Sequence, residues 1–157
     1  SVEAELGAVG GDEGGALYGH ADEAYFTDPA LARDFVDRTG IDALAVAIGN
    51  SHGKYKGEPK LDFTRLDVIR QQTGLPLVLH GGSGISDADF RRAISLGIHK
   101  INFYTGMSQA ALDTIETRMA DRQPVYDEFA QLLLSIEEAI TDTVATQMRT
   151  FGRAGQR

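Results

Sequence analysis

Residues 75–86 constrain the fold of this chain more than any other stretch, because an apolar run ends there in a histidine and a glycine-rich turn. The run from Leu75 to Leu79 predicts a strand buried on both faces, as in a parallel sheet. His80 and the sequence Gly-Gly-Ser-Gly follow directly. Parallel strands of barrel enzymes carry their chemistry at the carboxyl end, where an imidazole can bind a metal and glycine N–H groups can approach a phosphate. The stretch therefore predicts a metal ligand beside an anion site.

Strands and helices are expected to alternate along the rest of the chain. Asp28 and Pro29 predict a helix start, Gly40 predicts its end, and Ser86 with Asp89 predicts another helix start. The expected strands cover residues 1–6, 41–48, 75–79 and 99–104, and the expected helices cover residues 29–39, 61–72, 87–96, 108–122 and 125–151. This order is typical of α/β proteins with a parallel sheet.

The number of strand–helix units predicts part of a barrel. Four such units are half of a TIM (β/α)8 barrel, and a complete barrel needs about 250 residues. We therefore expect residues 1–157 to be the C-terminal half of a single (β/α)8 domain with a C-terminal helical extension. Ser1 is not an initiator methionine and is followed at once by a strand-like pattern, so we expect the chain to begin inside a larger protein.

Two segments depart from this alternation. Residues 7–24 are rich in glycine and acidic residues, and their apolar residues have no regular spacing, which predicts a mobile loop. Residues 125–151 predict a helix whose apolar stripe is longer than a sheet helix needs, so part of it is expected to pack on a partner or on the other half of the barrel. The stripe comprises Phe129, Leu133, Ile136, Ile140, Val144 and Met148.

Composition excludes several classes of function. The net charge of −8 and the absence of a basic run argue against nucleic-acid binding. The chain has no cysteine, so disulfides and thiolate-bound zinc are excluded, and a cytoplasmic location is expected. No membrane span or signal peptide is predicted.

His52 and His80 are the candidate metal ligands. Taken alone, each is more simply a hydrogen-bonded core or loop histidine. Both, however, directly follow a predicted strand and directly precede a glycine, so adjacent strands would bring the two imidazoles to one rim. Two neutral imidazoles suit Zn²⁺, which needs a third protein ligand that the residue pattern does not identify. Glu3 and Glu5 share one face of the first strand, either near this rim or in solvent.

The glycine-rich turn after His80 is the candidate phosphate site. A glycine-rich loop alone is a weak signal and can be a simple turn, but its place between a buried strand and a helix start favours an anion. Asn102 and Thr105, at the end of the next strand, could add amide and hydroxyl donors. Glu13 is most simply a solvated loop carboxylate, and a catalytic role would require the loop to close over substrate.

Four stretches form a pattern that runs through nearly the whole chain. They are residues 2–7 (Val-Glu-Ala-Glu-Leu-Gly), 45–53 (Ala-Val-Ala-Ile-Gly-Asn-Ser-His-Gly), 79–84 (Leu-His-Gly-Gly-Ser-Gly) and 100–102 (Lys-Ile-Asn). In this order they resemble the carboxyl-terminal half of the class II, zinc-dependent ketose-bisphosphate aldolases, which include fructose- and tagatose-bisphosphate aldolases. The resemblance implies a (β/α)8 barrel of which this chain holds strands five to eight.

The resemblance also implies roles for single residues. His52 and His80 match two of the three zinc ligands, Glu5 matches an acid near an alternative metal position, and Glu13 matches a mobile glutamate that assists proton transfer. The phosphate and substrate positions, with a monovalent cation (Na⁺ or K⁺), are matched by Gly53, Gly81, Ser83, Asn102 and Thr105.

Two departures from the family pattern bear on function. Tyr104 stands where fructose-specific members often have aspartate, so the phosphate contact and the choice between fructose and tagatose stay open. The Asp-His pair that supplies the third zinc ligand and the main acid/base in the family has no equivalent in this sequence. The 157-residue chain by itself is therefore expected to be inactive.

The resemblance implies a lyase of glycolysis and carbohydrate metabolism. The expected reaction is reversible cleavage of a ketose 1,6-bisphosphate to dihydroxyacetone phosphate and glyceraldehyde 3-phosphate. Expected partners are the phosphorylated sugar, the missing N-terminal half and further copies in a dimer or larger homo-oligomer. One alternative is a non-catalytic phosphate-binding half-barrel or assembly subunit, although a pure scaffold would not need the metal and phosphate residues. Another is a different phosphate-binding barrel enzyme such as an isomerase, which would not require His52 and His80 together.

Overall fold

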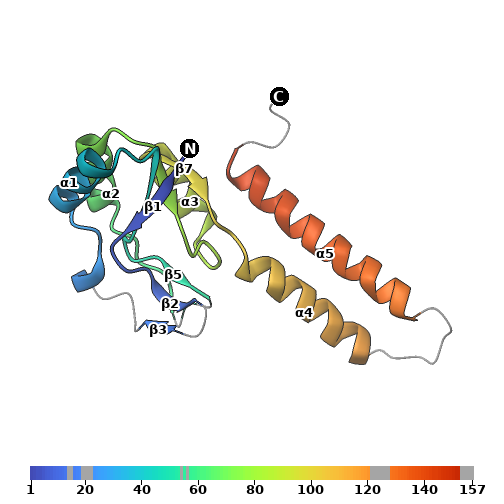
Figure 1. Ribbon diagram of the computed structural model, residues 1–157. Coiled ribbons are helices and arrows are strands. Elements are labelled where there is room, and N and C mark those ends of the chain that lie inside the picture. Colours follow the sequence, from blue (N-terminus) through green and yellow to red (C-terminus); the bar gives the residue numbers. More distant parts are fainter. Residues whose placement is uncertain (14–15, 19–22, 54, 56, 121–127, 153–157) are drawn as a thin grey trace. The chain divides into compact units, whose positions relative to one another are not determined.

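The computed structural model describes residues 1–13, 16–18, 23–53, 55, 57–120 and 128–152. The chain divides into two compact units, residues 1–103 and residues 104–157. The first unit holds all of the described strands, and the second consists of helices (Figure 1).

The first unit is built on a four-stranded parallel sheet, which confirms the predicted α/β class. The strand order is β1-β4-β6-β7, with β1 and β7 at its two edges. The strands are β1 (Glu3–Leu6), β4 (Ala43–Val46), β6 (Leu77–Leu79) and β7 (Ile98–Ile101), and the helices of this unit are η1 (Glu23–Tyr25), α1 (Pro29–Thr39), α2 (Phe63–Thr73) and α3 (Asp87–Ser95).

The core lies between these strands and helices. Leu77, Val78 and Leu79 are at most 1% exposed, so β6 is buried on both faces as its unbroken apolar run predicts. Leu66 of α2 and Phe90 of α3 are equally buried. The sheet therefore holds β6 rigidly, and the residues that follow β6 start from a fixed position.

Helix ends follow the predicted signals. The Asp28 carboxylate accepts hydrogen bonds from the N–H groups of Ala30 and Leu31 at the start of α1, at 2.8 and 3.0 Å. Ser86 caps α3 by accepting from the Asp89 N–H at 3.1 Å. These caps satisfy N–H groups that a helix leaves unpaired at its N-terminus.

The segment of residues 7–24, expected to be a loop, contains regular structure. A second sheet has the order β3-β2-β5, with β2 (Gly10–Glu13) antiparallel to β3 (Ala16–Tyr18) and parallel to β5 (Ser51–His52). Gly11 pairs with His52 so closely that a Cβ on Gly11 would lie 2.0 Å from the His52 carbonyl oxygen. The glycines that suggested a loop here permit a close approach of two strands. The predicted mobility of this segment stays a prediction.

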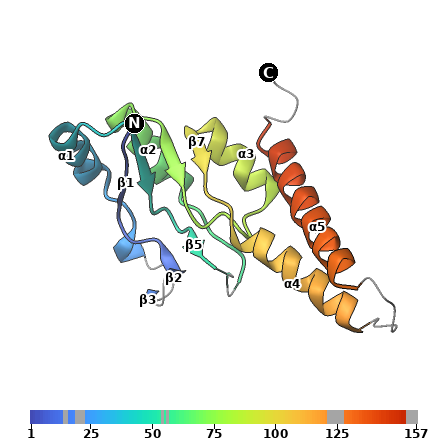
Figure 2. The same cartoon turned by 45° about the vertical axis from the view of Figure 1, so that its right-hand side comes forward.

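The second unit is a pair of helices that lie side by side, α4 (Thr105–Ala120) and α5 (Glu128–Thr150) (Figure 2). The predicted stripe on α5 is half-buried at Ile136, Ile140 and Val144. Near its ends the stripe is exposed, and Phe129 reaches 74% exposure within this structure. No helix in the described part of the chain is long and apolar enough to cross a membrane.

We predict that Gly11→Ala destabilises the chain by about 2 kcal/mol or more, because the new methyl group meets the His52 carbonyl and the backbone has φ +100°. The control is Gly40→Ala, which has a positive φ of +63° but no atom within 4 Å of the new Cβ. It should cost only about 1 kcal/mol. Urea unfolding measures both values. Equal losses would contradict the assigned contact between Gly11 and His52.

Candidate functional site

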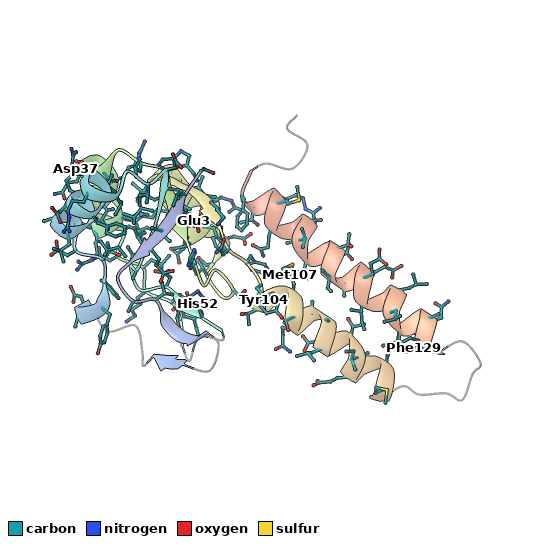
Figure 3. All side chains as sticks on the ribbon, viewed as in Figure 1. Glu3, Asp37, His52, Tyr104, Met107 and Phe129 are labelled. Carbon is teal, nitrogen blue, oxygen red and sulfur yellow. The ribbon has the colours of Figure 1, made fainter. Side chains whose placement is uncertain are left out.

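The two predicted histidines converge at the carboxyl ends of the strands. His52 closes β5 and His80 directly follows β6, and their ring centroids lie 5.9 Å apart with an interplanar angle of 42°. Figure 3 marks His52 on the first unit, together with Glu3 of β1. Sequence reasoning placed both imidazoles on one rim, and the structure has them there.

His80 lies between two carboxylates of β1. Its Nδ1 is 2.6 Å from Glu5 Oε2, and its Nε2 is 3.3 Å from Glu3 Oε1. The predicted alternation in β1 puts both glutamates on the same face of the strand, and that face is the one toward the histidines. Because an ionised carboxylate only accepts hydrogen bonds, the protonated ring donates to both glutamates, whereas the neutral ring donates to only one of them and leaves its other nitrogen free of a proton.

These contacts shift the pKa values of the three groups. The pKa of His80 is raised, chiefly by its hydrogen bond to Glu5, although burial opposes the shift. The pKa of Glu5 is lowered, chiefly by the hydrogen bond to His80. The pKa of Glu3 is lowered, chiefly by the hydrogen bond to Lys100.

Lys100 on β7 completes this network. Its Nζ lies 2.7 Å from Glu3 Oε2, although β7 and β1 are the two edge strands of the sheet. In a flat sheet the two edge strands would be about 14 Å apart, at about 4.7–4.9 Å per neighbouring pair. The long side chains of Lys100 and Glu3 therefore reach toward each other across β4 and β6, so that Glu3 contacts both Lys100 and His80.

The histidine pair fits a zinc ion in its donor chemistry and spacing. Two imidazoles that bind one zinc at about 2.0–2.1 Å through ring nitrogens have ring centres roughly 5–6 Å apart, and neutral nitrogen with carboxylate oxygen suits this metal. Among the described residues, no group of three or more histidine, cysteine, aspartate or glutamate side chains is arranged to hold a metal ion. The pair therefore offers part of a metal centre.

The glycine-rich turn after β6 lies against two neighbouring segments. A Cβ on Gly81 would be 2.2 Å from the Ser51 carbonyl oxygen, and a Cβ on Gly82 would be 3.2 Å from the Asn102 carbonyl oxygen. The N–H of Gly82 donates to Asn102 O at 3.3 Å. The turn thus lies against the Ser51–His52 segment at Gly81 and against Asn102 at Gly82.

The N-terminus of α3, which follows this turn, already has its N–H groups and its positive dipole end satisfied by side chains of the helix itself. Ser86 caps α3, and Asp87 and Asp89 occupy its first turn. These carboxylates already face the positive end of the helix dipole. An anion at this turn would therefore depend on N–H groups of the glycine loop rather than on the helix start, which the sequence pattern favours.

Three further positions lie outside the described side chains of the first unit. Glu13 ends β2, and its side chain lies outside the described part of the chain. Thr105 begins α4 in the second unit, and Tyr104 directly precedes that helix with 73% exposure within this structure. The roles predicted for Glu13 and Thr105 stay predictions, as do those of Gly53 and Ser83.

Sequence reasoning missed Asn50 and Tyr55. The buried Asn50 donates from Nδ2 to the His80 carbonyl oxygen at 3.0 Å. The Tyr55 hydroxyl accepts from the Ser51 N–H at 2.8 Å and donates to the Gly81 carbonyl oxygen at 2.9 Å. Burial raises the pKa of Tyr55 to about 12, so its hydroxyl stays protonated at neutral pH. A polar residue at the end of an apolar strand was the available signal for Asn50.

Comparisons with known proteins point in one direction. The protein family described as fructose-bisphosphate aldolase class-II matches residues 1–156. The chain is 45% identical over 156 residues to the fructose-bisphosphate aldolase of Geobacillus stearothermophilus, and equally to a protein of Bacillus subtilis named probable fructose-bisphosphate aldolase. Each alignment covers 99% of this chain and 53% of the relative.

A solved structure gives the same result. The crystal structure of the YdjI aldolase from Escherichia coli K12 aligns with a TM-score of 0.78 and 40% identity, over 98% of this chain and 50% of that chain. The chain thus spans about half the length of the curated relatives that it matches.

We predict that Glu5→Gln lowers the pKa of His80 toward its ordinary value in the metal-free chain, because the main cause of the shift is removed. In the unmodified chain, the raised His80 pKa adds stability at low pH that is lost as the pH rises through it. The lowered Glu5 pKa adds stability that is lost as the pH falls through it. The attraction between protonated His80 and ionised Glu5 is thus greatest at pH values between the pKa of Glu5 and the pKa of His80.

NMR titration of the histidine rings measures this shift. Glu23→Gln is the control, because Glu23 is exposed and pairs with Arg65 rather than with His80. An unchanged His80 titration in Glu5→Gln would contradict the assigned contact.

Proposed function

Because the chain belongs to the class II fructose-bisphosphate aldolase family, we propose that the protein containing it is a zinc-dependent ketose-bisphosphate aldolase. The reaction is the reversible aldol cleavage of a fructose or tagatose 1,6-bisphosphate to dihydroxyacetone phosphate and glyceraldehyde 3-phosphate. The observation that carries this proposal is the convergence of His52 and His80 at 5.9 Å beside a glycine-rich turn.

The proposed zinc ligands in this chain are His52 and His80, with a further ligand from outside the described residues. When bound, the metal supplies a Lewis acid for the ketone group of the substrate. Glu5 supports the site through His80. A carboxylate on the second ring nitrogen orients metal-binding histidines and makes them better ligands, and Glu5 holds Nδ1 at 2.6 Å.

The phosphate of the substrate is proposed to bind at the glycine-rich turn. Gly53, Gly81 and Ser83 would hold it with a monovalent cation, Na⁺ or K⁺, and Asn102 and Thr105 would contact the substrate. The closeness of Gly81, Asn102 and the His52 segment supports this arrangement. A phosphate fixed there would orient the reacting carbons of the sugar against the histidine pair.

Proton transfer is proposed to involve Glu13 together with an acid/base outside this chain. Glu13 ends β2, and β2 pairs with the strand of His52, so the backbone of this acidic segment is anchored next to the site. We also propose that the isolated 157-residue chain does not cleave the sugar bisphosphate, since it lacks the family's Asp-His pair.

The remaining proposals concern architecture and location. The described part of the parallel sheet has β1 and β7 as its edges, which supports half of a (β/α)8 barrel that the other half would close. The exposed apolar residues on α4 and α5, such as Leu112 and Phe129, support a homo-oligomer. The protein would work in the cytoplasm.

The test is zinc binding by the chain and aldol cleavage by any longer protein that carries it. His52→Ala and His80→Ala should each lower the zinc affinity by about a hundredfold or more. Replacing a residue that only hydrogen-bonds to a metal ligand already lowers metal affinity by about 10–100-fold. They should also abolish cleavage.

The control is His99→Ala, because His99 Nδ1 contacts the Gly97 carbonyl oxygen instead of the histidine pair. Calorimetry and an assay of dihydroxyacetone phosphate release provide the readouts. Full activity after zinc removal, or unchanged zinc affinity in both site variants, would refute the proposal.

A further inference from the structure

The sheet itself does not set the distance between His52 and His80. The parallel pairing of β4 with β6 joins Leu44 to Leu77 and Ala45 to Val78. Both histidines lie beyond these pairs, His80 just after β6 and His52 six residues after β4. Other contacts must therefore hold the two histidine-bearing segments together.

Asn50 makes the first of these contacts. It is 1% exposed, and its Oδ1 accepts from the Ile48 N–H at 2.8 Å while its Nδ2 donates to the His80 carbonyl oxygen at 3.0 Å. An amide side chain is suited to this position because it offers a donor and an acceptor at once. The side chain thus ties the segment before His52 to the backbone of His80.

Tyr55 makes the second contact, three residues after His52. Its hydroxyl accepts from the Ser51 N–H at 2.8 Å and donates to the Gly81 carbonyl oxygen at 2.9 Å. Its ring also covers the turn, since a Cβ on Gly84 would lie 3.0 Å from Tyr55 Cδ2. One hydroxyl therefore joins the residue before one histidine to the residue after the other.

The two segments also touch directly between these bridges. A Cβ on Gly81 would lie 2.2 Å from the Ser51 carbonyl oxygen and 3.0 Å from the His52 nitrogen. A side chain at position 81 would therefore clash with the backbone of the other segment, and Asn50 and Tyr55 bridge the two segments beside this close approach.

We propose that Asn50 and Tyr55 are positioning residues that clamp the His52 segment to the His80 segment and thereby set the separation of the two imidazoles. Neither side chain is a ligand in this proposal. The link to metal binding rests on the function proposed above, whereas the clamp itself can be tested in the metal-free chain.

The first experiment compares Tyr55→Phe with the unmodified chain by NMR without metal. The Ser51 N–H loses its acceptor, so its exchange with solvent should become faster, and the nuclear Overhauser effect between the His52 and His80 rings should weaken. Tyr25→Phe is the matched control, because it removes the same hydroxyl from a tyrosine that is 58% exposed. An unchanged ring-to-ring signal in Tyr55→Phe would overturn the proposal.

The second experiment measures Zn²⁺ affinity and the visible spectrum of the Co²⁺ form at a temperature where all variants are folded. Tyr55→Phe should lower the Zn²⁺ affinity by about tenfold or more and change the Co²⁺ spectrum, while Tyr25→Phe should leave both unchanged. Loss of stability with unchanged affinity and spectrum would mean that Tyr55 serves the fold only, which overturns the proposal.

Asn50→Asp provides an independent variant. Aspartate keeps an acceptor for the Ile48 N–H but has no donor for the His80 carbonyl, and its added negative charge by itself favours a cation. Weaker Zn²⁺ binding in this variant would therefore support the clamp, and stronger binding would count against it. If no form of the chain binds Zn²⁺, the proposed metal centre fails, and the metal-free NMR comparison still decides whether the clamp exists.

Discussion

The contact between the Gly81 backbone and the Ser51 carbonyl is the constraint on which the candidate site depends. No side chain fits at position 81, since a Cβ would lie 2.2 Å from that oxygen. Glycine also adopts φ +64° without the strain that most side chains would add there. This close approach brings the end of β6 against the segment that ends in His52, and so brings the two imidazoles together beside the glycine turn.

Much of the architecture could be predicted from local sequence patterns. The run from Leu75 to Leu79 predicts a doubly buried strand, and Asp28 and Ser86 predict helix starts, because each signal acts within a few residues of the chain. The convergence of His52 and His80 could be predicted because both follow strands of one parallel sheet. Here local pattern and global topology point the same way.

The contacts that complete the site could not be predicted from the sequence alone. Glu3 lies 77 residues from His80 and 97 residues from Lys100 along the chain. The alternation in β1 put Glu3 and Glu5 on one face, but it could not tell a face toward the site from a face in solvent. Asn50 and Tyr55 were missed because their partners are backbone groups of another segment. In residues 10–18, a glycine-rich composition hid two strands, since glycine serves both turns and close strand pairs.

The ion pair between Lys100 and Glu3 bears on the order in which the chain folds. It joins the first and last strands of the parallel sheet, so nearly the whole of the first unit lies inside the loop that it closes. Closing so long a loop costs conformational entropy that only the intervening strand pairs can offset. We therefore expect the pair to form only once β4 and β6 have joined the sheet. The charges around Glu3 and His80 thus depend on the whole parallel sheet and not on β1 alone.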